Sequence, residues 1–209
     1  MVHIYYHIYA IDGVESIIDE QLSLIEKHFD FPYILNVGIS IAENNISTTS
    51  ILKKIKPNLR DIRSKGNEWT TLDLIRNDVE KFGDSDYILY IHTKGASKQN
   101  DNKYDNIVSW RHLMNYFNIE KVKNVFKLFE KTEFNTHGVI LKGHFYSGNF
   151  WWAKGSYLKT INLENIKLNR FAAETNYIQC GKDWKPYSAY NNENDNDYET
   201  YFKREEYTK

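Results

Sequence analysis

The sequence predicts an α/β domain with a mostly parallel sheet, and two observations carry this prediction. Buried runs of β-branched and aromatic residues alternate with amphipathic runs along the chain. The first two buried runs, residues 2–11 and 33–41, are joined by one helical run with short loops. This order favours parallel pairing with a right-handed crossover. Ligands of such sheets bind beyond the carboxyl ends of the strands, so we look for function there.

Length and composition exclude several classes of protein. The 209 residues carry a net charge of −1, one cysteine and 15% aromatic residues. The length fits one α/β domain or two small ones. Near-neutral charge argues against a nucleic-acid partner, and no apolar run approaches the roughly 20 residues of a membrane span. One cysteine excludes an intramolecular disulfide, and the amino-terminal residues lack a signal peptide's basic and apolar regions.

We therefore expect a cytoplasmic protein with no membrane span. The aromatic residues have two interpretations. They reflect either the codons of an AT-rich genome or a ring-lined site for sugars or flat ligands.

The amino-terminal half is expected to alternate strands and helices. Apolar residues three and four apart predict a helix over 14–29, and Pro32 closes its connection to the next strand. Residues 46–62 allow a short helix and a strand around Pro57. Thr70 or Thr71 can cap a helix over 72–82, which Gly83 ends. Residues 87–92 are apolar almost throughout, as expected of a central strand covered on both faces.

The carboxyl-terminal half alternates in the same way after a polar, exposed loop over 96–106. We expect helices over 107–117, 120–130, 156–161 and 170–179, and strands over 136–141, 149–153 and 186–190. Residues 191–197 are almost all Asn, Asp and Glu, too polar to bury a face. The sequence therefore predicts one domain over 1–190 and a polar linker or tail over 191–209, with room for fusion to further domains.

Polar groups cluster at the ends of the predicted strands. The first strand ends in Tyr9, Ala10, Ile11 and Asp12, the central one in His92, Thr93, Lys94 and Gly95, and His144 follows a third. Gly95 allows a close backbone approach, and Lys94 offers a compact charge for a phosphate. The chain has no P-loop and no Gly-x-Gly-x-x-Gly motif. Each residue alone also fits a structural role, but their coincidence on one edge favours a binding site.

Four runs carry a resemblance to a known family. Tyr87–Gly95, Trp110-Arg111, Ser147–Ala153 and Arg170–Glu174 resemble small GT-A glycosyltransferases. The nearest likenesses are the chlorovirus-encoded capsid-glycan enzymes and the rhamnan-synthesis protein F type, over most of residues 1–190. The resemblance implies a Rossmann-like GT-A fold. It also implies inverting transfer of a sugar from a nucleoside diphosphate donor to a glycan hydroxyl. A UDP-sugar is the expected donor. A viral member would act in the host cytoplasm.

The resemblance departs at the metal-binding motif. Most GT-A enzymes end the central strand with Asp-x-Asp, where this sequence has His92-Thr93-Lys94. Asp84 and Asp86 precede the same strand, roughly 20 Å away, and are better interpreted as turn residues. Two options remain open. Lys94 neutralises the diphosphate directly, or a divalent ion such as Mn or Mg binds through His92 with a loop carboxylate, Asp101 or Asp105.

The resemblance also implies donor contacts in the first half of the chain. Gly66, Glu68 and Thr71 resemble a turn that lies against the donor. Glu68 could accept hydrogen bonds from ribose or sugar hydroxyls, or it could simply favour the first turn of a helix. Tyr9 would flank the base, where stacking is worth roughly 1–3 kcal/mol, or would be an ordinary strand aromatic.

The expected sugar and acceptor contacts lie in the second half, at His144, Gly148, Asn149, Trp151, Trp152 and Arg111. Successive strand residues point to opposite faces, so at most one of the two tryptophans can line the site. Tyr146 is a further candidate ring. Glu174 is the expected general base, which would take the proton of the acceptor hydroxyl. Its alternative role is an ion pair with Arg170 one turn away, and Asp183 is the reserve candidate for the base.

These observations leave two main hypotheses from different classes. The first is a glycosyltransferase that uses a nucleotide-sugar and a glycan acceptor. The second is a non-catalytic module that binds nucleotide-sugar or glycan within a larger glycan-assembly protein. A nucleotide-using enzyme of another kind, such as a methyltransferase, is disfavoured because no glycine-rich loop follows Ile11.

Overall fold

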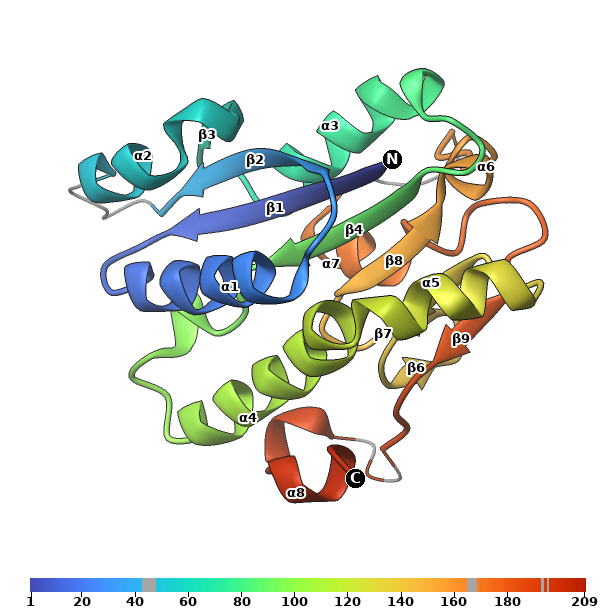
Figure 1. Cartoon of the computed structure of the whole chain (residues 1–209). Helices are drawn as coiled ribbons and strands as arrows, with labels where there is room; N and C mark the ends of the chain where they lie inside the picture. The colour runs from blue at the N-terminus through green and yellow to red at the C-terminus, as the bar shows by residue number, and fades with distance from the viewer. Residues whose placement is uncertain (43–47, 165–168, 193, 195) are drawn as a thin grey trace.

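The protein is a three-layer α/β structure built on one seven-stranded sheet (Figure 1). The computed structural model describes residues 1–42, 48–164, 169–192, 194 and 196–209. Within that part the strand order is β3-β2-β1-β4-β8-β5-β9, with β8 antiparallel to both of its neighbours. The other pairings in this sheet are parallel. The expectation of a mixed, mostly parallel α/β sheet flanked by helices is confirmed.

The amino-terminal half forms the parallel side of the sheet. β1 (Val2–Ala10), α1 (Glu15–His28) and β2 (Tyr33–Ile41) form the expected strand–helix–strand unit, with parallel strands. The next elements are α2 (Thr49–Ile55), η1 (Lys56–Asn58), β3 (Leu59–Ser64), α3 (Trp69–Asp78), η2 (Val79–Lys81) and β4 (Tyr87–His92). The predicted short helix and strand around Pro57 are confirmed as α2 and β3, and the first residues of that prediction, 46–47, lie outside the described residues.

The start of α3 corrects one prediction. The helix begins at Trp69, so Thr70 and Thr71 lie inside its first turn and cap nothing. The Asn67 side chain instead accepts a hydrogen bond from the Trp69 backbone N–H. Thr71 is thereby turned towards the sheet, where its Oγ1 lies 3.0 Å from His7 Nδ1.

The carboxyl-terminal half completes the sheet and contributes helices to both of its faces. Helix α4 and helix α5 are joined through a π-helical turn, η4, where two separate helices were expected. Instead of a plain loop, η3 follows β4. The elements are η3 (Ala96–Lys98), α4 (Tyr104–Asn115), η4 (Tyr116–Glu120), α5 (Val122–Lys131), β5 (Thr136–Gly138), β6 (Leu141–Lys142), β7 (Phe145–Tyr146), β8 (Trp151–Lys154), α6 (Gly155–Leu158), α7 (Arg170–Thr175), β9 (Pro186–Ser188), η5 (Asp197–Glu199) and α8 (Arg204–Tyr207).

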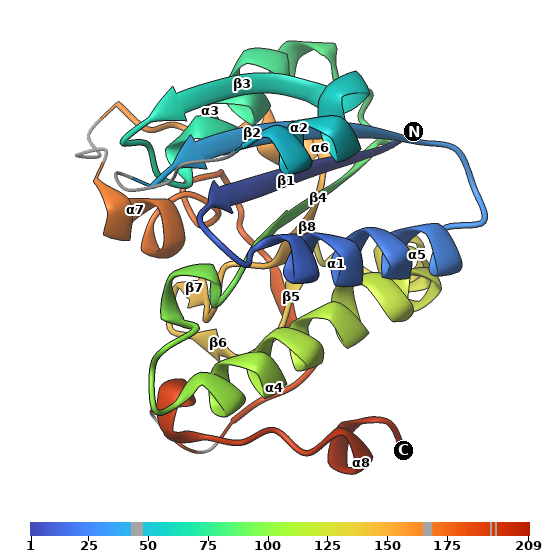
Figure 2. The ribbon, with the colours of Figure 1, turned by 90° about the vertical axis from the view of Figure 1, so that its left-hand side faces the viewer.

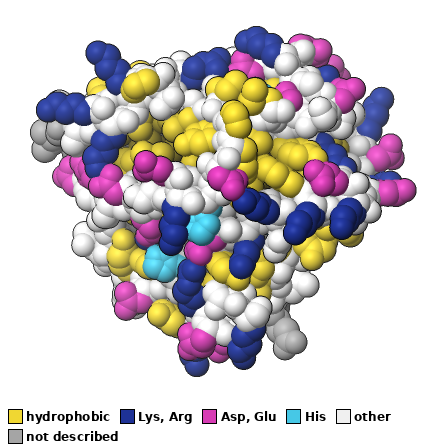
Figure 3. Space-filling model, in the orientation of Figure 1, with side chains coloured by type: hydrophobic (Ala, Val, Ile, Leu, Met, Phe, Trp, Pro, Cys, Tyr) yellow, Lys and Arg dark blue, Asp and Glu magenta, His cyan; other side chains and the backbone are white. Residues whose placement is uncertain are grey.

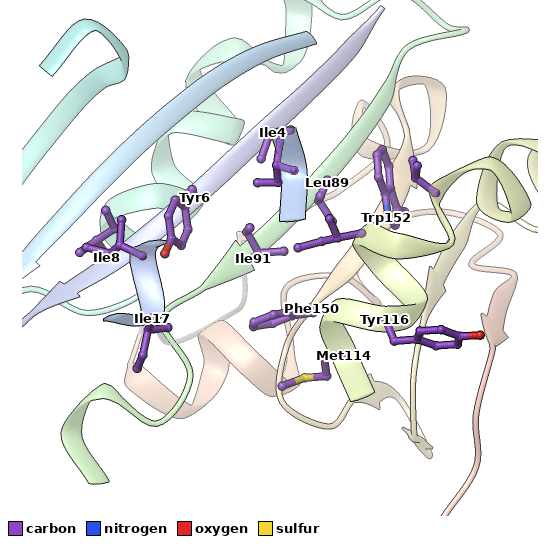
Figure 4. Packing of buried hydrophobic residues seen from close by; sticks show 14 of the residues in the cluster. Ile4, Tyr6, Ile8, Ile17, Leu89, Ile91, Met114, Tyr116, Phe150 and Trp152 are labelled. Carbon is purple, nitrogen blue, oxygen red and sulfur yellow. The ribbon is translucent and has the colours of Figure 1, made fainter. Parts of the chain in front are cut away.

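Two hydrophobic clusters lie on opposite faces of the sheet. Side chains of α1, α2, α4 and α5 pack on one face, and those of α3, α6 and α7 pack on the other. Figure 4 shows the first cluster, in which Ile4 and Tyr6 of β1 and Leu89 and Ile91 of β4 point towards the helices. Because both faces are covered, β4 is apolar along most of its length, as its sequence predicted.

The segment after residue 190 differs from expectation. Figure 2 shows it running beside α4, with α8 against that helix. Phe202 and Tyr207 are buried in the first cluster, and Asp197 is buried as well. The expectation of a polar linker or tail over 191–209 is therefore corrected, because a few apolar side chains fix the polar segment to the domain. Residues 193 and 195 of this segment lie outside the described part.

Figure 3 shows the face that carries α1 and α4. Hydrophobic side chains gather over its upper part, and Lys and Arg side chains gather near its centre. No helix within the described ranges combines the length and apolarity needed to cross a bilayer.

Candidate functional site

The candidate site lies at the carboxyl end of the central strand β4. β1 and β4 are parallel and end at the same edge of the sheet, and the loop before antiparallel β8 begins at that edge too. His92 therefore lies beside the Gly148 loop, with its Nε2 2.9 Å from the Gly148 carbonyl oxygen. Residues far apart in the chain meet here because the sheet order places β8 next to β4.

The centre of the site is a hydrogen-bond network around the carboxylate of Glu68. Its Oε2 accepts a bond of 3.0 Å from the Tyr90 hydroxyl and one of 2.5 Å from Asn149 Nδ2. Asn149 Oδ1 in turn accepts a bond from Trp151 Nε1. Burial, with the Glu68 carboxylate beside it, raises the pKa of Tyr90 well above its ordinary value, so its hydroxyl stays protonated and donates.

Asn149 owes its place in this network to an unusual backbone conformation. It follows Gly148, and both residues have positive φ, 87° for the glycine and 55° for the asparagine. Asparagine is among the few residues with a side chain that enter this region readily. The turn points the buried amide of Asn149 at Glu68 and at the Ala173 carbonyl of α7.

Glu174 reaches the same loop from α7. Its Oε1 accepts a bond of 3.0 Å from the Gly148 backbone N–H. The amino-terminal end of α7 is fixed by the Asn169 side chain, which accepts a bond from the Ala172 N–H, while the Asn169 carbonyl accepts one from Trp69 Nε1. The helix that carries Glu174 is thus linked to the start of α3, next to Glu68.

Two histidines at this edge are held neutral. Burial, with the charge of Lys94, lowers the pKa of His92 to about 4, and burial lowers that of His7 to about 3. A neutral His92 next to a carbonyl oxygen must donate from Nε2, so its Nδ1 carries no proton. His92 is therefore a neutral donor that fixes the Gly148 loop.

Lys94 follows His92 by two residues in the turn after β4. Its Nζ is 4.1 Å from the centre of the Trp110 ring, although the residue is only 8% exposed. Within the described residues no carboxylate lies within ion-pair distance of this ammonium. Cation–π contact offsets part of the cost of burying the charge. An anionic ligand would find this buried ammonium without a carboxylate partner from the described residues and could pair with it directly.

Arg111 binds the turn after β4 and Glu20 of α1, and its hydrogen bonds do not go to the Glu68 network. Its Nη1 donates to the Lys94 carbonyl oxygen at 3.0 Å, and Nε and Nη2 bind both oxygens of Glu20. These three contacts engage the guanidinium within the protein. Its expected role as a sugar contact is therefore not part of the proposed site.

The other predicted donor residues lie along the same edge with internal contacts. Tyr9 N–H donates to Thr93 Oγ1, and the Asp12 carbonyl accepts a bond from Gln99, so the ends of β1 and β4 are joined. Ala10 is buried, Ile11 is half-buried and the Asp12 side chain is exposed. Gly66 packs so closely that a Cβ there would lie 2.6 Å from Ser40 Oγ. Gly95 has a φ of 90°, which permits the tight turn after β4.

The rings proposed for sugar contact are not available at the surface. Trp151, Trp152 and Tyr146 are fully buried, with Trp151 and Trp152 on opposite faces of the sheet. These three rings pack in the core and are not part of the proposed site as ligand contacts. His144 is exposed in the turn between β6 and β7, next to Phe145. Asp183 lies in a turn in which its carbonyl accepts a bond from Asn135.

No metal site emerges from the described residues, where no three His, Cys, Asp or Glu side chains gather to hold an ion. Asp101 accepts the Lys103 N–H and pairs with Lys98, so the option of Asp101 with His92 is not assembled. Asp86 accepts the Gly83 N–H and binds the amino terminus, as expected of a turn before β4. A divalent ion bound through His92 with Asp101 or Asp105 stays a prediction, since no such ligand group is assembled among the described residues.

Two groups of residues at the candidate site were not predicted. Tyr90 shares a face with His92 by strand alternation, a signal that could have placed it at the site. Asp197 and Tyr198 offered no such signal, since they lie in a run of polar residues. The Ser147 hydroxyl, next to Gly148, donates to Asp197 at 2.5 Å.

Comparison with known proteins identifies a family but not an activity. Residues 3–207 match the model of a family described as "Domain of unknown function (DUF8361)". The chain belongs to this family. The DUF8361 match includes Phe202 and Tyr207, in agreement with their packing on the domain.

No curated protein matches the chain. Among solved structures, a cytidylyltransferase from Leptospira borgpetersenii serovar Hardjo-bovis (strain JB197) is similar with a TM-score of 0.43 and 13% identity. The match covers 93% of this chain and 76% of that one. Similarity at this level supports no conclusion about activity.

Proposed function

We propose that this chain is an inverting glycosyltransferase that moves a sugar from a nucleoside diphosphate donor, UDP-sugar first, to a glycan hydroxyl. One observation carries the proposal. Two carboxylates, Glu68 and Glu174, bind the Gly148–Asn149 turn at the carboxyl end of β4, and the buried cation Lys94 follows the same strand and lies against Trp110. Group transfer from a diphosphate needs a cation for the leaving group and a carboxylate for the attacking hydroxyl, both close to one point.

The proposed chemistry assigns a role to each of these residues. The acceptor oxygen bonds to the anomeric carbon while the bond from that carbon to the phosphate oxygen breaks, and the nucleoside diphosphate leaves with the electron pair. Glu174 takes the proton of the acceptor hydroxyl. Lys94 neutralises the charge that develops on the departing diphosphate. The second oxygen of Glu68 accepts a hydroxyl of the ribose or the sugar.

A donor panel tests the proposal first. Melting temperature is measured with UDP, GDP, CMP and UDP-sugars, each with Mn²⁺ and with EDTA. Stabilisation by the UDP compounds, with or without the metal, is the expected result. Absence of any nucleotide response would overturn the proposal.

A non-catalytic binding module is the second candidate, and one contact favours it. Glu174 Oε1 already accepts the Gly148 N–H, so a structural role alone could account for this carboxylate. Glu174→Gln separates the two candidates. A transferase retains donor binding in this variant and loses turnover by at least 100-fold. A binding module shows no turnover even in the wild type with a panel of glycan acceptors.

A further inference from the structure

A segment distant in sequence lies next to the Lys94 ammonium. Tyr198, 104 positions further along the chain than Lys94, lies with its ring centre 5.3 Å from Lys94 Nζ. Its ring meets that of Trp110 edge-on, at 5.2 Å and 86°. The cation thus lies near two rings, one from α4 and one from η5. Of the two, Tyr198 is the exposed one, at 42%.

The segment that carries Tyr198 is anchored to both parts of the site. Asp197, only 3% exposed, binds Ser147 Oγ at 2.5 Å, Lys142 Nζ at 2.8 Å and Asn192 Nδ2 at 2.8 Å. Ser147 is the residue before Gly148, so this carboxylate holds the loop that binds His92 and Glu174.

The second anchor is helix α4, which carries Trp110. The Tyr198 carbonyl accepts a bond from Asn106 Nδ2, and Phe202 N–H donates to Ser109 Oγ. Ion pairs at the surface, such as Lys103 with Glu199, add to these contacts. Segment 196–202 is therefore fixed to the Gly148 loop at one point and to α4 at others.

We infer that Asp197 and Tyr198 are positioning residues that make the carboxyl-terminal segment a wall of the phosphate site. Tyr198 packs edge-on against Trp110 and lies beside the Lys94 ammonium, and Asp197 fixes both the segment and the Gly148 loop. A cation held in place before binding loses little conformational freedom when the diphosphate arrives. The inference rests on the proposed function insofar as Lys94 is taken to bind phosphate.

The test compares Tyr198→Ala and Tyr198→Phe with Tyr201→Ala. Tyr201 is an exposed tyrosine of the same segment, at 58%, and serves as the matched control. One readout is the rate at which an amine-acetylating reagent modifies Lys94, measured by peptide mass spectrometry. The other is the affinity for UDP and for pyrophosphate, measured by calorimetry.

Tyr198→Ala is expected to raise the acetylation rate of Lys94 at least fivefold and to weaken UDP and pyrophosphate binding roughly threefold to tenfold, since one cation–π wall is lost. Tyr198→Phe keeps the ring and should behave as the wild type. Asp197→Asn should shift both readouts in the same direction as Tyr198→Ala, while Glu199→Gln should not. Tyr198 is exposed, so its variants keep the inference testable even if Asp197→Asn does not fold.

Equal acetylation and affinity in Tyr198→Ala and Tyr201→Ala would overturn the inference. The proposed function fails in a different way, through wild-type protein that binds neither UDP nor pyrophosphate. In that case the acetylation rates still decide whether Tyr198 positions Lys94.

Discussion

Glu68 and Asn149, 81 residues apart in the chain, are joined by a hydrogen bond of 2.5 Å from Asn149 Nδ2 to Glu68 Oε2. The bond connects the start of α3 to the loop before β8, across the end of β4. It exists because Asn149 adopts a left-handed backbone conformation that directs its amide towards the sheet edge.

Replacement of Asn149 tests this connection. Asn149→Ala removes bonds to Glu68, Trp151 and Ala173 and leaves a β-carbon at positive φ. We expect the free energy of unfolding to fall by on the order of 3 kcal/mol. Asn149→Gly should recover about 1 kcal/mol of this, because glycine accepts the conformation without strain. Urea unfolding measures both, and equal stability of the two variants would show that the backbone strain has no part in the effect.

Lys94 is expected to supply binding energy for phosphate. Lys94→Ala should weaken UDP binding roughly tenfold, as expected for the loss of one charged hydrogen bond. Lys98→Ala removes an exposed lysine one turn further on, paired with Asp101, and is the matched control. Calorimetry at one salt concentration compares the two. A similar loss in both variants would argue for general charge attraction rather than for a site at Lys94.

Gly148 leaves no room for a side chain. A Cβ there would lie 2.5 Å from Met114 Sδ, and φ is 87°. Gly148→Ala should therefore displace the loop, destabilise the fold by on the order of 2–3 kcal/mol and weaken donor binding. Gly143, in the exposed turn between β6 and β7, also has positive φ but has open space around it.

Gly143→Ala is the control for Gly148→Ala, because it carries the backbone strain without the clash. Its expected cost is about 1 kcal/mol, with donor affinity unchanged. Thermal unfolding and calorimetry check both variants. Equal destabilisation by the two would mean that the contact with Met114 is easily relieved.

Glu20 predicts a window of acid sensitivity. Burial opposes its ionisation, but hydrogen bonds from His112 and Arg111 outweigh this and lower its pKa to about 2 from an ordinary 4.5. A carboxylate whose pKa is lower in the folded protein than in the unfolded chain stabilises the fold at pH values above its unfolded pKa. That contribution, on the order of 3 kcal/mol, is lost as the pH falls from 4.5 towards 2.

Urea unfolding of the wild type and of Glu20→Gln between pH 6 and pH 2.5 tests this window. The variant should be less stable at pH 6, and its stability should fall less steeply below pH 4.5. Parallel curves for the two proteins would exclude Glu20 as a source of the acid sensitivity.

Several elements were predictable because local pattern alone decides them. The apolar run at 87–92 predicted β4 to the residue, since a strand covered on both faces has no polar positions to spare. The amphipathic spacing over 14–29 predicted α1 to within one residue at each end. The π-helical turn at 116–120 was missed, because an extra residue shifts the apolar spacing, and that shift was interpreted as a break between two helices.

The candidate site was predictable only in part. Glu68, His92, Lys94, Asn149 and Glu174 were named from strand ends and from the family resemblance, and their roles stay predictions. Trp151 was expected to offer a ring to a sugar, yet its ring is buried and its Nε1 binds Asn149. Composition shows that rings are present but cannot show whether other side chains cover them.

The sequence by itself determined the main strands, the longer helices and the parallel start of the sheet, because periodicity and short loops act over neighbouring residues. The tertiary structure alone decided that β8 lies beside β4 in antiparallel orientation. It also decided that Asp197 and Tyr198 return to the Gly148 loop and to Lys94. These contacts join residues 50 to 104 positions apart. Their stability comes from burial in a finished core, which no local pattern encodes.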